Sequence, residues 1–336
     1  MPRSRRVVVI VAIVMVVAGL LVWVNRRGAH PGAGAATIAL RLRQTDSAPR
    51  DLNAYTKLAT WVDGFDFGPA YQRNNGAPPI TPKAIDDMAA NGVTTLFLQA
   101  VRDDARSPGG IVDRARVTEF LIRAHRRGLR VVGWYLPTFK DVAADVANLR
   151  QILDFKVLGH RFDGVAIDIE DVDDIKDVAD RNQRLIDESK QLRAAAGSDT
   201  VGAIVLPPVL TEVVNTSYWP EFPWPELRPL YDVWLPMSYW TFRTSASGYH
   251  DGFAYSDESI RRLRNNLGDQ NAVVHAIGGV GDKVTIDEIQ RFVESLPADR
   301  AVGGSIYDWT SMTPADRAAL ASGFATGKAA NLPPPP

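Results

Sequence analysis

The chain has 336 residues, of which 46% are apolar and 23% charged, proportions ordinary for a globular protein that can bury a sizeable core. Its formal net charge of -1 argues against a nucleic-acid partner held by a broad basic surface. The absence of cysteine excludes disulfides and thiolate metal sites.

The N-terminal segment, residues 1–27, predicts a membrane anchor. An uncharged apolar run over residues 7–24 lies between arginines on both sides. At about 1.5 Å per residue this run is roughly 27 Å long, close to the hydrocarbon thickness of a bilayer. Because Arg26 and Arg27 interrupt the pattern of a cleavage site, we expect a single-pass transmembrane helix with the C-terminal domain outside the cell. Secretion after cleavage near residues 33–36 is the alternative.

Two further segments are expected to lie outside the folded domain. Residues 28–60 are interpreted as a linker and connector, because they open with the flexible stretch GAHPGAGAA. Residues 327–336 end in four prolines and are expected to form a polyproline-like tail with no core to join.

Residues 61–326 predict an α/β fold, a (β/α)8 TIM barrel. Short strand-like runs alternate with helix-like stretches, some with start signals such as Thr285-x-x-Glu288, and this alternation predicts a parallel sheet. A count of eight strands favours closure into a barrel, which needs about 250 residues. The fifth crossover, residues 211–231, is rich in proline and aromatic residues and predicts an irregular loop on the catalytic side. The expected strands are residues 61–67, 93–101, 129–137, 162–170, 201–207, 233–240, 272–280 and 301–309.

The fourth strand, residues 162–170, places two carboxylates at the face where such barrels perform chemistry. Side chains alternate along a strand, so Ala166, Asp168 and Glu170 share the face that points into the barrel. A carboxylate buried there without a partner would be costly. The pair is therefore either functional or a structural pair satisfied by Arg or Tyr.

This strand resembles the fourth-strand signature of family 18 glycoside hydrolases, the chitinase-like barrels, whose pattern is D-x-x-D-x-D-x-E. Asp163, Asp168 and Glu170 match the pattern, and Ala166 replaces its middle Asp. The resemblance implies that Glu170 is the general acid, that Asp168 stabilises the substrate's acetamido group, and that Asp163 belongs to the site. An adjacent negative charge would help to raise the pKa of the acid. With Ala166, either another group assists, the enzyme is slow, or the substrate differs.

Two other strands carry weaker matches. Met237 and Tyr239 on the sixth strand resemble the family's M-x-Y element, and the resemblance implies that Tyr239 bonds the acetamido carbonyl. The glycine-rich eighth strand resembles the one that ends in a tryptophan under the sugar, here Trp309. Trp309 falls one residue late, on the other face unless a bulge intervenes.

Further candidates for substrate binding lie near predicted strand ends. Trp219 and Trp224 on the irregular loop are interpreted either as sugar-stacking platforms or as core. No cofactor or metal ligand is expected, because the histidines show no ligand spacing and the acidic run after Glu170 reads as a solvated loop. The remaining substrate-binding candidates are Gln99, Trp134, Trp240, Tyr307 and Asp308.

The sequence therefore predicts an extracytoplasmic glycoside hydrolase acting on an N-acetylated, β-linked polysaccharide. The alternative is a lectin-like barrel that binds glycan without turnover, although such a barrel would tend to lose Glu170. A third possibility is a hydrolase with two enzyme carboxylates, in which Asp66 or Asp308 lies across the cleft from Glu170. The separation would then be about 5 Å for retention or roughly 6.5–9.5 Å for inversion.

Overall fold

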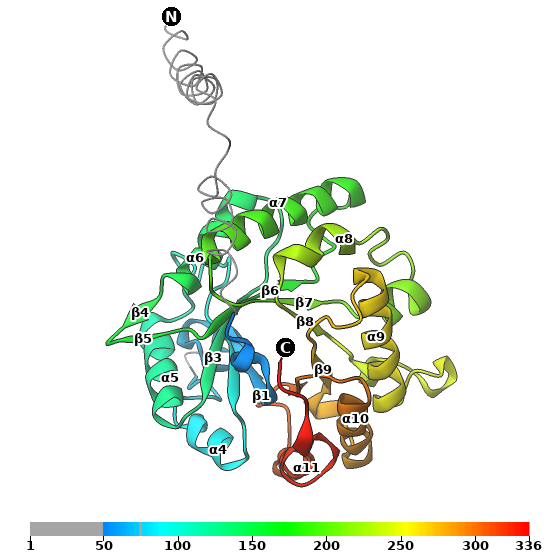
Figure 1. Ribbon diagram of the computed structural model, residues 1–336. Helices are drawn as coiled ribbons and strands as arrows, with labels where there is room; N and C mark the ends of the chain where they lie inside the picture. The colour runs from blue at the N-terminus through cyan, green and yellow to red at the C-terminus, as the bar shows by residue number, and fades with distance from the viewer. Residues whose placement is uncertain (1–49, 74–75, 336) are drawn as a thin grey trace, which may run out of the picture. The chain divides into compact units, whose positions relative to one another are not determined.

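The computed structural model describes residues 50–73 and 76–335 (Figure 1). The predicted membrane anchor and the first part of the predicted linker lie outside these residues. Within the described residues, no helix combines the length and the apolar character needed to cross a membrane.

Eight parallel strands form the core of the fold. Neighbouring strands pair in the order β8-β7-β6-β3-β2-β1-β10-β9. Parallel bridges from Trp234 to Val274 and from Met237 to Ile277 join β8 to β9 and close the barrel. The prediction of an eight-stranded α/β barrel is confirmed. The strands are β1 Lys57–Val62, β2 Thr95–Gln99, β3 Arg130–Tyr135, β6 Gly164–Ile169, β7 Val201–Val205, β8 Val233–Pro236, β9 His275–Val280 and β10 Gly303–Tyr307.

Helices surround the barrel (Figure 1). Their starts carry side-chain caps: Thr285 forms the predicted capping box with Glu288, and Thr313 forms one with Asp316. A short antiparallel hairpin, β4 Lys156–Val157 and β5 His160–Arg161, extends beyond α6. The α-helices are α3 Gly64–Phe67, α4 Ala84–Ala90, α5 Arg114–Arg126, α6 Val142–Leu153, α7 Val178–Ala196, α8 Trp224–Leu227, α9 Gly252–Leu267, α10 Ile286–Ala298 and α11 Pro314–Ala325. The short 3-10 and π turns are η1 Leu52–Tyr55, η2 Pro69–Tyr71, η4 Leu210–Val214, η5 Arg228–Leu230, η6 Trp240–Phe242, η7 Ser245–Ser247, η8 Gly281–Lys283 and η9 Lys328–Asn331.

The first strand differs from the prediction. It spans Lys57–Val62, whereas the run of apolar and acidic residues 61–67 was expected to be the strand. Asp63 ends it, because its side chain accepts hydrogen bonds from the backbone N–H groups of Phe65 and Asp66 and starts α3. Residues 57–60 of the expected connector therefore belong to the barrel.

Tyr55 fills the amino end of the barrel. Its side chain is fully buried, and its hydroxyl donates to the carbonyl oxygen of Val165 at 2.7 Å. A Cβ atom at Gly164 or Gly202 would approach Tyr55 to 2.8 Å and 2.7 Å, so these strands need glycine there. This ring leaves the opposite, carboxyl end of the barrel for the polar side chains of β6.

The C-terminal segment also differs from the prediction. The described part of residues 327–336 was expected to join no core, yet Ala329 is buried and Leu332 packs against the core. Their apolar side chains gain by leaving water, and the 3-10 turn η9 brings them onto the barrel.

Candidate active site

Asp168 and Glu170 lie at the carboxyl end of β6. Strand β6 is buried along its whole length, with Val165, Ile167 and Ile169 on one face and Ala166 and Asp168 on the other. Glu170 follows the strand on the side of Asp168 and is only half-buried, whereas Asp168 is 7% exposed. The two carboxylates therefore differ in their access to solvent, with Asp168 beneath and Glu170 at the mouth.

Asp168 lacks the partners that a buried carboxylate normally needs. Its Oδ1 atom is buried and has no hydrogen-bond partner among the described residues. Burial raises the pKa of Asp168 well above its ordinary value, and the neighbouring charge of Glu170 raises it further. The structural pairing with Arg or Tyr, considered from the sequence, is not formed by this atom.

Glu170 has a raised pKa as well. Burial is the main cause, and the negative charge of Asp171 adds to it. The pair therefore keeps a proton at pH values at which isolated carboxyl groups have lost theirs. Glu170 lines the cleft, and Asp168 lies beneath it. Of the two carboxyl groups, Glu170 is therefore the one more accessible to a ligand.

A cleft of about 470 Å³ opens beside Glu170. Met237 and Tyr239, from the end of β8, form part of its wall, as the sixth-strand motif predicted for a shared site. The rest of the wall comes from the segments that follow β7 and β8 and from α9. These residues are Leu206, Pro207, Leu210, Val214, Asn215, Tyr218, Phe242, Arg243 and Tyr255.

Tyr239 lies between two acidic groups. Burial raises the pKa of its hydroxyl far above the ordinary value, and the charges of Glu170, Asp168 and Asp308 raise it further, in that order. The hydroxyl is therefore protonated at neutral pH and can donate a hydrogen bond into the cleft. Its ring lies 6.2 Å from that of Tyr307.

The second acidic group contains Asp63, Asp66 and Asp308 at the ends of β1 and β10. One carboxylate oxygen from each lies within 4.8 Å of the others, the spacing that a hard cation would require. Tyr307 donates to Asp63 at 3.0 Å. Burial, with the charges of Asp63 and Asp308, raises the pKa of Asp66 to about 7, so a retained proton already reduces the repulsion. Asp66 and Asp308 thus lie together, and neither is among the residues that line the cleft beside Glu170.

Two predicted sugar-binding tryptophans lie outside the cleft. Trp240 is fully buried against Phe292, with ring centroids 5.4 Å apart. A bulge does interrupt the pairing of β10 with β9 after Ile306, yet Trp309 is only 3% exposed and the guanidinium of Arg317 covers its ring at 4.1 Å. Both side chains are therefore buried against other residues and offer no exposed ring face to a sugar.

Two further candidates, Gln99 and Trp134, are also buried. Gln99 is 2% exposed, and its Oε1 accepts from the backbone N–H of Gly64 and from Arg102, each at 2.9 Å. Trp134 is 4% exposed and packs edge-on against Trp61. Both support the barrel mouth from within.

The loop between β7 and β8 is irregular, as predicted, but its tryptophans are core residues. Trp219 and Trp224 are buried, and Trp219 donates to Asn182. Neither offers an exposed face for a sugar.

Asp163 lies at the opposite end of β6 from the candidate site. Its Oδ2 accepts from the backbone N–H of Val131 at 2.7 Å and lies 3.0 Å from Nε2 of His125. The nearest nitrogen of Arg130 is 3.7 Å away. Asp163 therefore joins β3, α5 and β6 at the amino end of the barrel, and the structure separates it from Asp168 and Glu170.

The cleft also contains residues that the sequence did not single out. Phe242 and Arg243 follow the sixth-strand motif directly, and Tyr218 lies in the irregular loop. Their positions after strands β7 and β8 were a usable signal, because loops at that end of a barrel form active sites.

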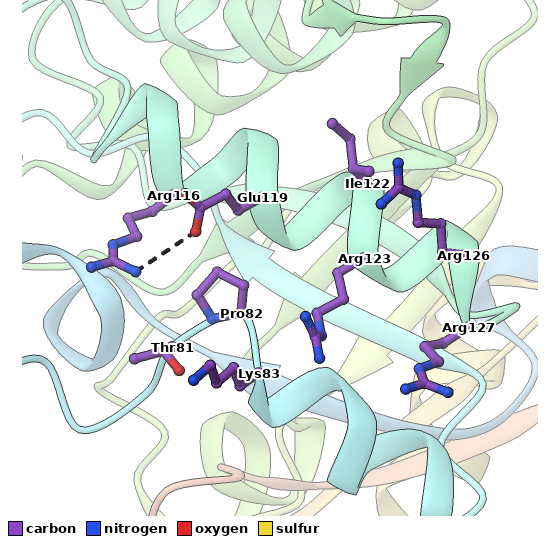
Figure 2. Close-up of a pocket in the computed structure, with 9 residues that line it drawn as sticks. All are labelled: Thr81, Pro82, Lys83, Arg116, Glu119, Ile122, Arg123, Arg126 and Arg127. Atoms are coloured by element: carbon purple, nitrogen blue, oxygen red, sulfur yellow. Dashed lines mark ion pairs between the residues drawn. The ribbon is translucent and has the colours of Figure 1, made fainter.

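A larger hollow, of about 770 Å³, lies away from the strand ends between the start of α4 and α5 (Figure 2). Figure 2 shows Arg116 and Arg123 extending from α5 toward the segment that holds Lys83. Arg123 and Arg127 pair with Asp86, and Arg116 lies near Glu119. These ion pairs neutralise part of the basic groove, which contacts none of the carboxylates of the barrel mouth.

Comparisons with known proteins identify the fold. No protein-family model and no curated protein sequence matches the chain. A class V chitinase from Pseudomonas fluorescens Pf-5 is 11% identical with a TM-score of 0.57, covering 80% of this chain and 99% of that one. A family 18 N-acetylglucosaminidase from Paenibacillus barengoltzii is 10% identical with a TM-score of 0.52, covering 80% and 99%. The spore cortex-lytic enzyme SleL of Bacillus megaterium QM B1551 is 7% identical with a TM-score of 0.51, covering 82% and 74%.

The TM-scores, at these low identities, show a shared architecture. The predicted resemblance to the chitinase-like TIM barrels is confirmed at the level of the fold, and the chain is a divergent example of it.

Proposed function

We propose that this protein is a glycosidase that cleaves an N-acetylated, β-linked glycan, with Glu170 as the general acid. One observation carries the proposal: two carboxylates with raised pKa values lie at the mouth of the barrel, and Glu170 lines the cleft with Asp168 beneath it. Enzymes use such shifts to keep an acid protonated near neutral pH, which typically accelerates cleavage by about 10²–10⁴-fold. The chitinases and the N-acetylglucosaminidase with the same fold support the choice of substrate class.

Asp168 has the properties required to assist an acetamido nucleophile. Its buried Oδ1 has no donor among the described residues, and a substrate N–H is the kind of partner that would satisfy it. A hydrogen bond of this type favours the ionised form of Asp168 and leaves the shared proton on Glu170. The protonated hydroxyl of Tyr239 would then hold the acetamido carbonyl oxygen. Each group thus acts at a different atom of the same substrate.

Ala166 fits this proposal through the geometry beneath Asp168. The side chain of Ala166 is fully buried and supplies no charge under Asp168. With no second carboxylate below Asp168, Glu170 is the charged group of the described residues that raises the pKa of Asp168, in addition to the effect of burial. We expect the proton to move between these two residues, which replaces a relay through the middle Asp of the resembled motif.

The alternative is a glycan-binding barrel without turnover, and the test separates the two. The wild-type protein and the Glu170→Gln variant are each incubated with fluorescently labelled N-acetylated and non-acetylated oligosaccharides. We expect cleavage of the acetylated series only, with a loss of about 100-fold or more in Glu170→Gln. Binding by both forms without cleavage in either would support the lectin-like alternative, and cleavage that survives in Glu170→Gln would remove the proposed acid.

We further propose that the catalytic domain acts outside the cytoplasm, anchored by residues 1–27. The apolar run over residues 7–24 supports this location. In cells that express the full chain, added protease should degrade the domain without lysis of the cells. Resistance of the domain until lysis, together with recovery in the soluble fraction, would contradict the proposal.

A further inference from the structure

We propose that the cleft beside Glu170 recognises a carboxylate on the glycan, and that Arg243 is the residue that binds it. The inference rests on the proposed glycosidase function and specifies its substrate class: an acidic, N-acetylated glycan. It begins from an arginine that contacts the cleft and has no partner within the described part of the protein.

Arg243 follows the turn η6 and lines the same cleft as Glu170 and Tyr239. Within the described ranges its guanidinium forms no ion pair and no hydrogen bond, and its Nε atom is buried without a partner. By contrast, Arg262 on the neighbouring helix α9 pairs with both Glu258 and Glu212. The unpaired state of Arg243 is therefore a local feature and does not reflect a lack of acidic residues in this region.

The surroundings of Arg243 strengthen the attraction between its guanidinium and an anion. Leu206, Leu210 and Val214 make much of the cleft apolar, which weakens the screening of a charge. Apart from Arg243 and the tyrosines, Glu170 is the ionisable residue that lines the cleft, and its pKa is raised. The positive charge of Arg243 is therefore not paired with any carboxylate of the described residues.

A carboxylate matches this charge better than a neutral hydroxyl group does. A guanidinium presents donors in a planar fork that binds both oxygens of a carboxylate. A buried donor without a partner is costly, so a ligand that satisfies Nε and a terminal nitrogen regains that cost. The negative charge would also favour the protonated form of Glu170, which the proposed cleavage requires. Specificity and acid catalysis would therefore favour the same ligand.

Two kinds of glycan carry such a group: one with an ether-linked lactyl carboxylate and one with a uronic acid. The test uses three tetrasaccharides of equal length: β-1,4-linked N-acetylglucosamine, the same chain with a 3-O-lactyl group on alternate sugars, and a chain that alternates N-acetylglucosamine with glucuronic acid. Binding is measured by calorimetry on the Glu170→Gln background, so that cleavage does not interfere. The pair of carboxylated probes identifies the source of the carboxylate.

We expect at least one carboxylated tetrasaccharide to bind about 10- to 100-fold more tightly than the neutral one. The preference should disappear in Arg243→Gln, persist in part in Arg243→Lys, and weaken with added salt. Arg228→Gln is the matched control, because Arg228 is exposed and contacts Asp269 outside the cleft. Melting temperatures of all variants verify that they fold.

Two results would overturn the inference, and they are distinguishable. Equal binding of all three probes, unchanged by Arg243→Gln, would remove the role of Arg243 and leave the proposed glycosidase function in place. Failure of every probe to bind to folded protein would contradict both proposals.

Discussion

The carboxylates at the two ends of strand β6 differ in their hydrogen-bond partners. At the amino end, Asp163 has a backbone N–H, an imidazole nitrogen and a guanidinium within 4 Å. At the carboxyl end, about 16 Å away for five residues of strand, Asp168 has an oxygen without a partner and a raised pKa. Asp163 is the more exposed of the two, with a side-chain exposure of 23%, and it also has the hydrogen-bond partners that Oδ1 of Asp168 lacks.

This contrast separates a structural carboxylate from one that awaits a ligand. Asp163 gains from its partners and joins three elements of the barrel. Asp168 and Glu170 cost stability in the free protein, which is typical of groups retained for a function. Both ends belong to one sequence motif, so the motif alone assigns them to the same site.

The largest expected effect is at the carboxyl end. Asp168→Asn should lower kcat on an acetylated glycan by about 100-fold or more, because the amide cannot stabilise a developing positive charge. The same variant should raise the free energy of unfolding at pH 7. The folded pKa of Asp168 lies above the unfolded value, so ionisation of this group destabilises the fold as pH rises above about 4. The increase in the free energy of unfolding should therefore disappear near pH 3. If urea denaturation showed Asp168→Asn to be less stable than the wild type at pH 7, Asp168 would not be a destabilising carboxylate.

The amino end should respond in the opposite way. Asp163→Ala should lower the free energy of unfolding by about 1–3 kcal/mol, because the N–H of Val131 and the imidazole of His125 lose their acceptor. Activity per folded molecule should stay at the wild-type level. Urea denaturation and a rate assay on folded protein provide the two readouts. Asp163→Asn keeps an acceptor, so its free energy of unfolding should fall by less. A loss of kcat in folded protein of either variant would indicate that Asp163 belongs to the active site.

The smallest expected effect concerns a buried carboxylate that lies outside the cleft. Glu188 on α7 is fully buried, neither of its oxygens has a partner among the described residues, and burial raises its pKa well above the ordinary value. Glu188→Gln should raise the free energy of unfolding by about 1 kcal/mol at pH 7 and by less at pH 4, since the folded pKa is the higher one. Because Glu188 does not contact the cleft, kcat should not change. A large loss of activity would contradict the prediction, because it would show that a buried carboxylate without partners affects catalysis even outside the cleft.

Features that depend on local chemistry followed from the sequence. Alternation along β6 placed Ala166 and Asp168 on one face, and Thr285 with Glu288 marked the start of α10. The succession of strands and helices predicted the closed barrel. The first strand was displaced because Asp63 acts as a cap, and a cap depends on which backbone N–H groups it meets.

Only the tertiary structure decided which of these residues belong to the site. Trp240 and Trp309 lie near strand ends in the sequence, yet helices α10 and α11 cover them. Arg243 follows the sixth-strand motif in the sequence, but its lack of a partner can be seen only in the described fold. The sequence by itself therefore determined the barrel and the carboxylate pair on β6, since side-chain alternation and capping act between near neighbours. The partners of those carboxylates come from other strands and helices, so only their packing could separate Asp163 from Asp168 and Glu170.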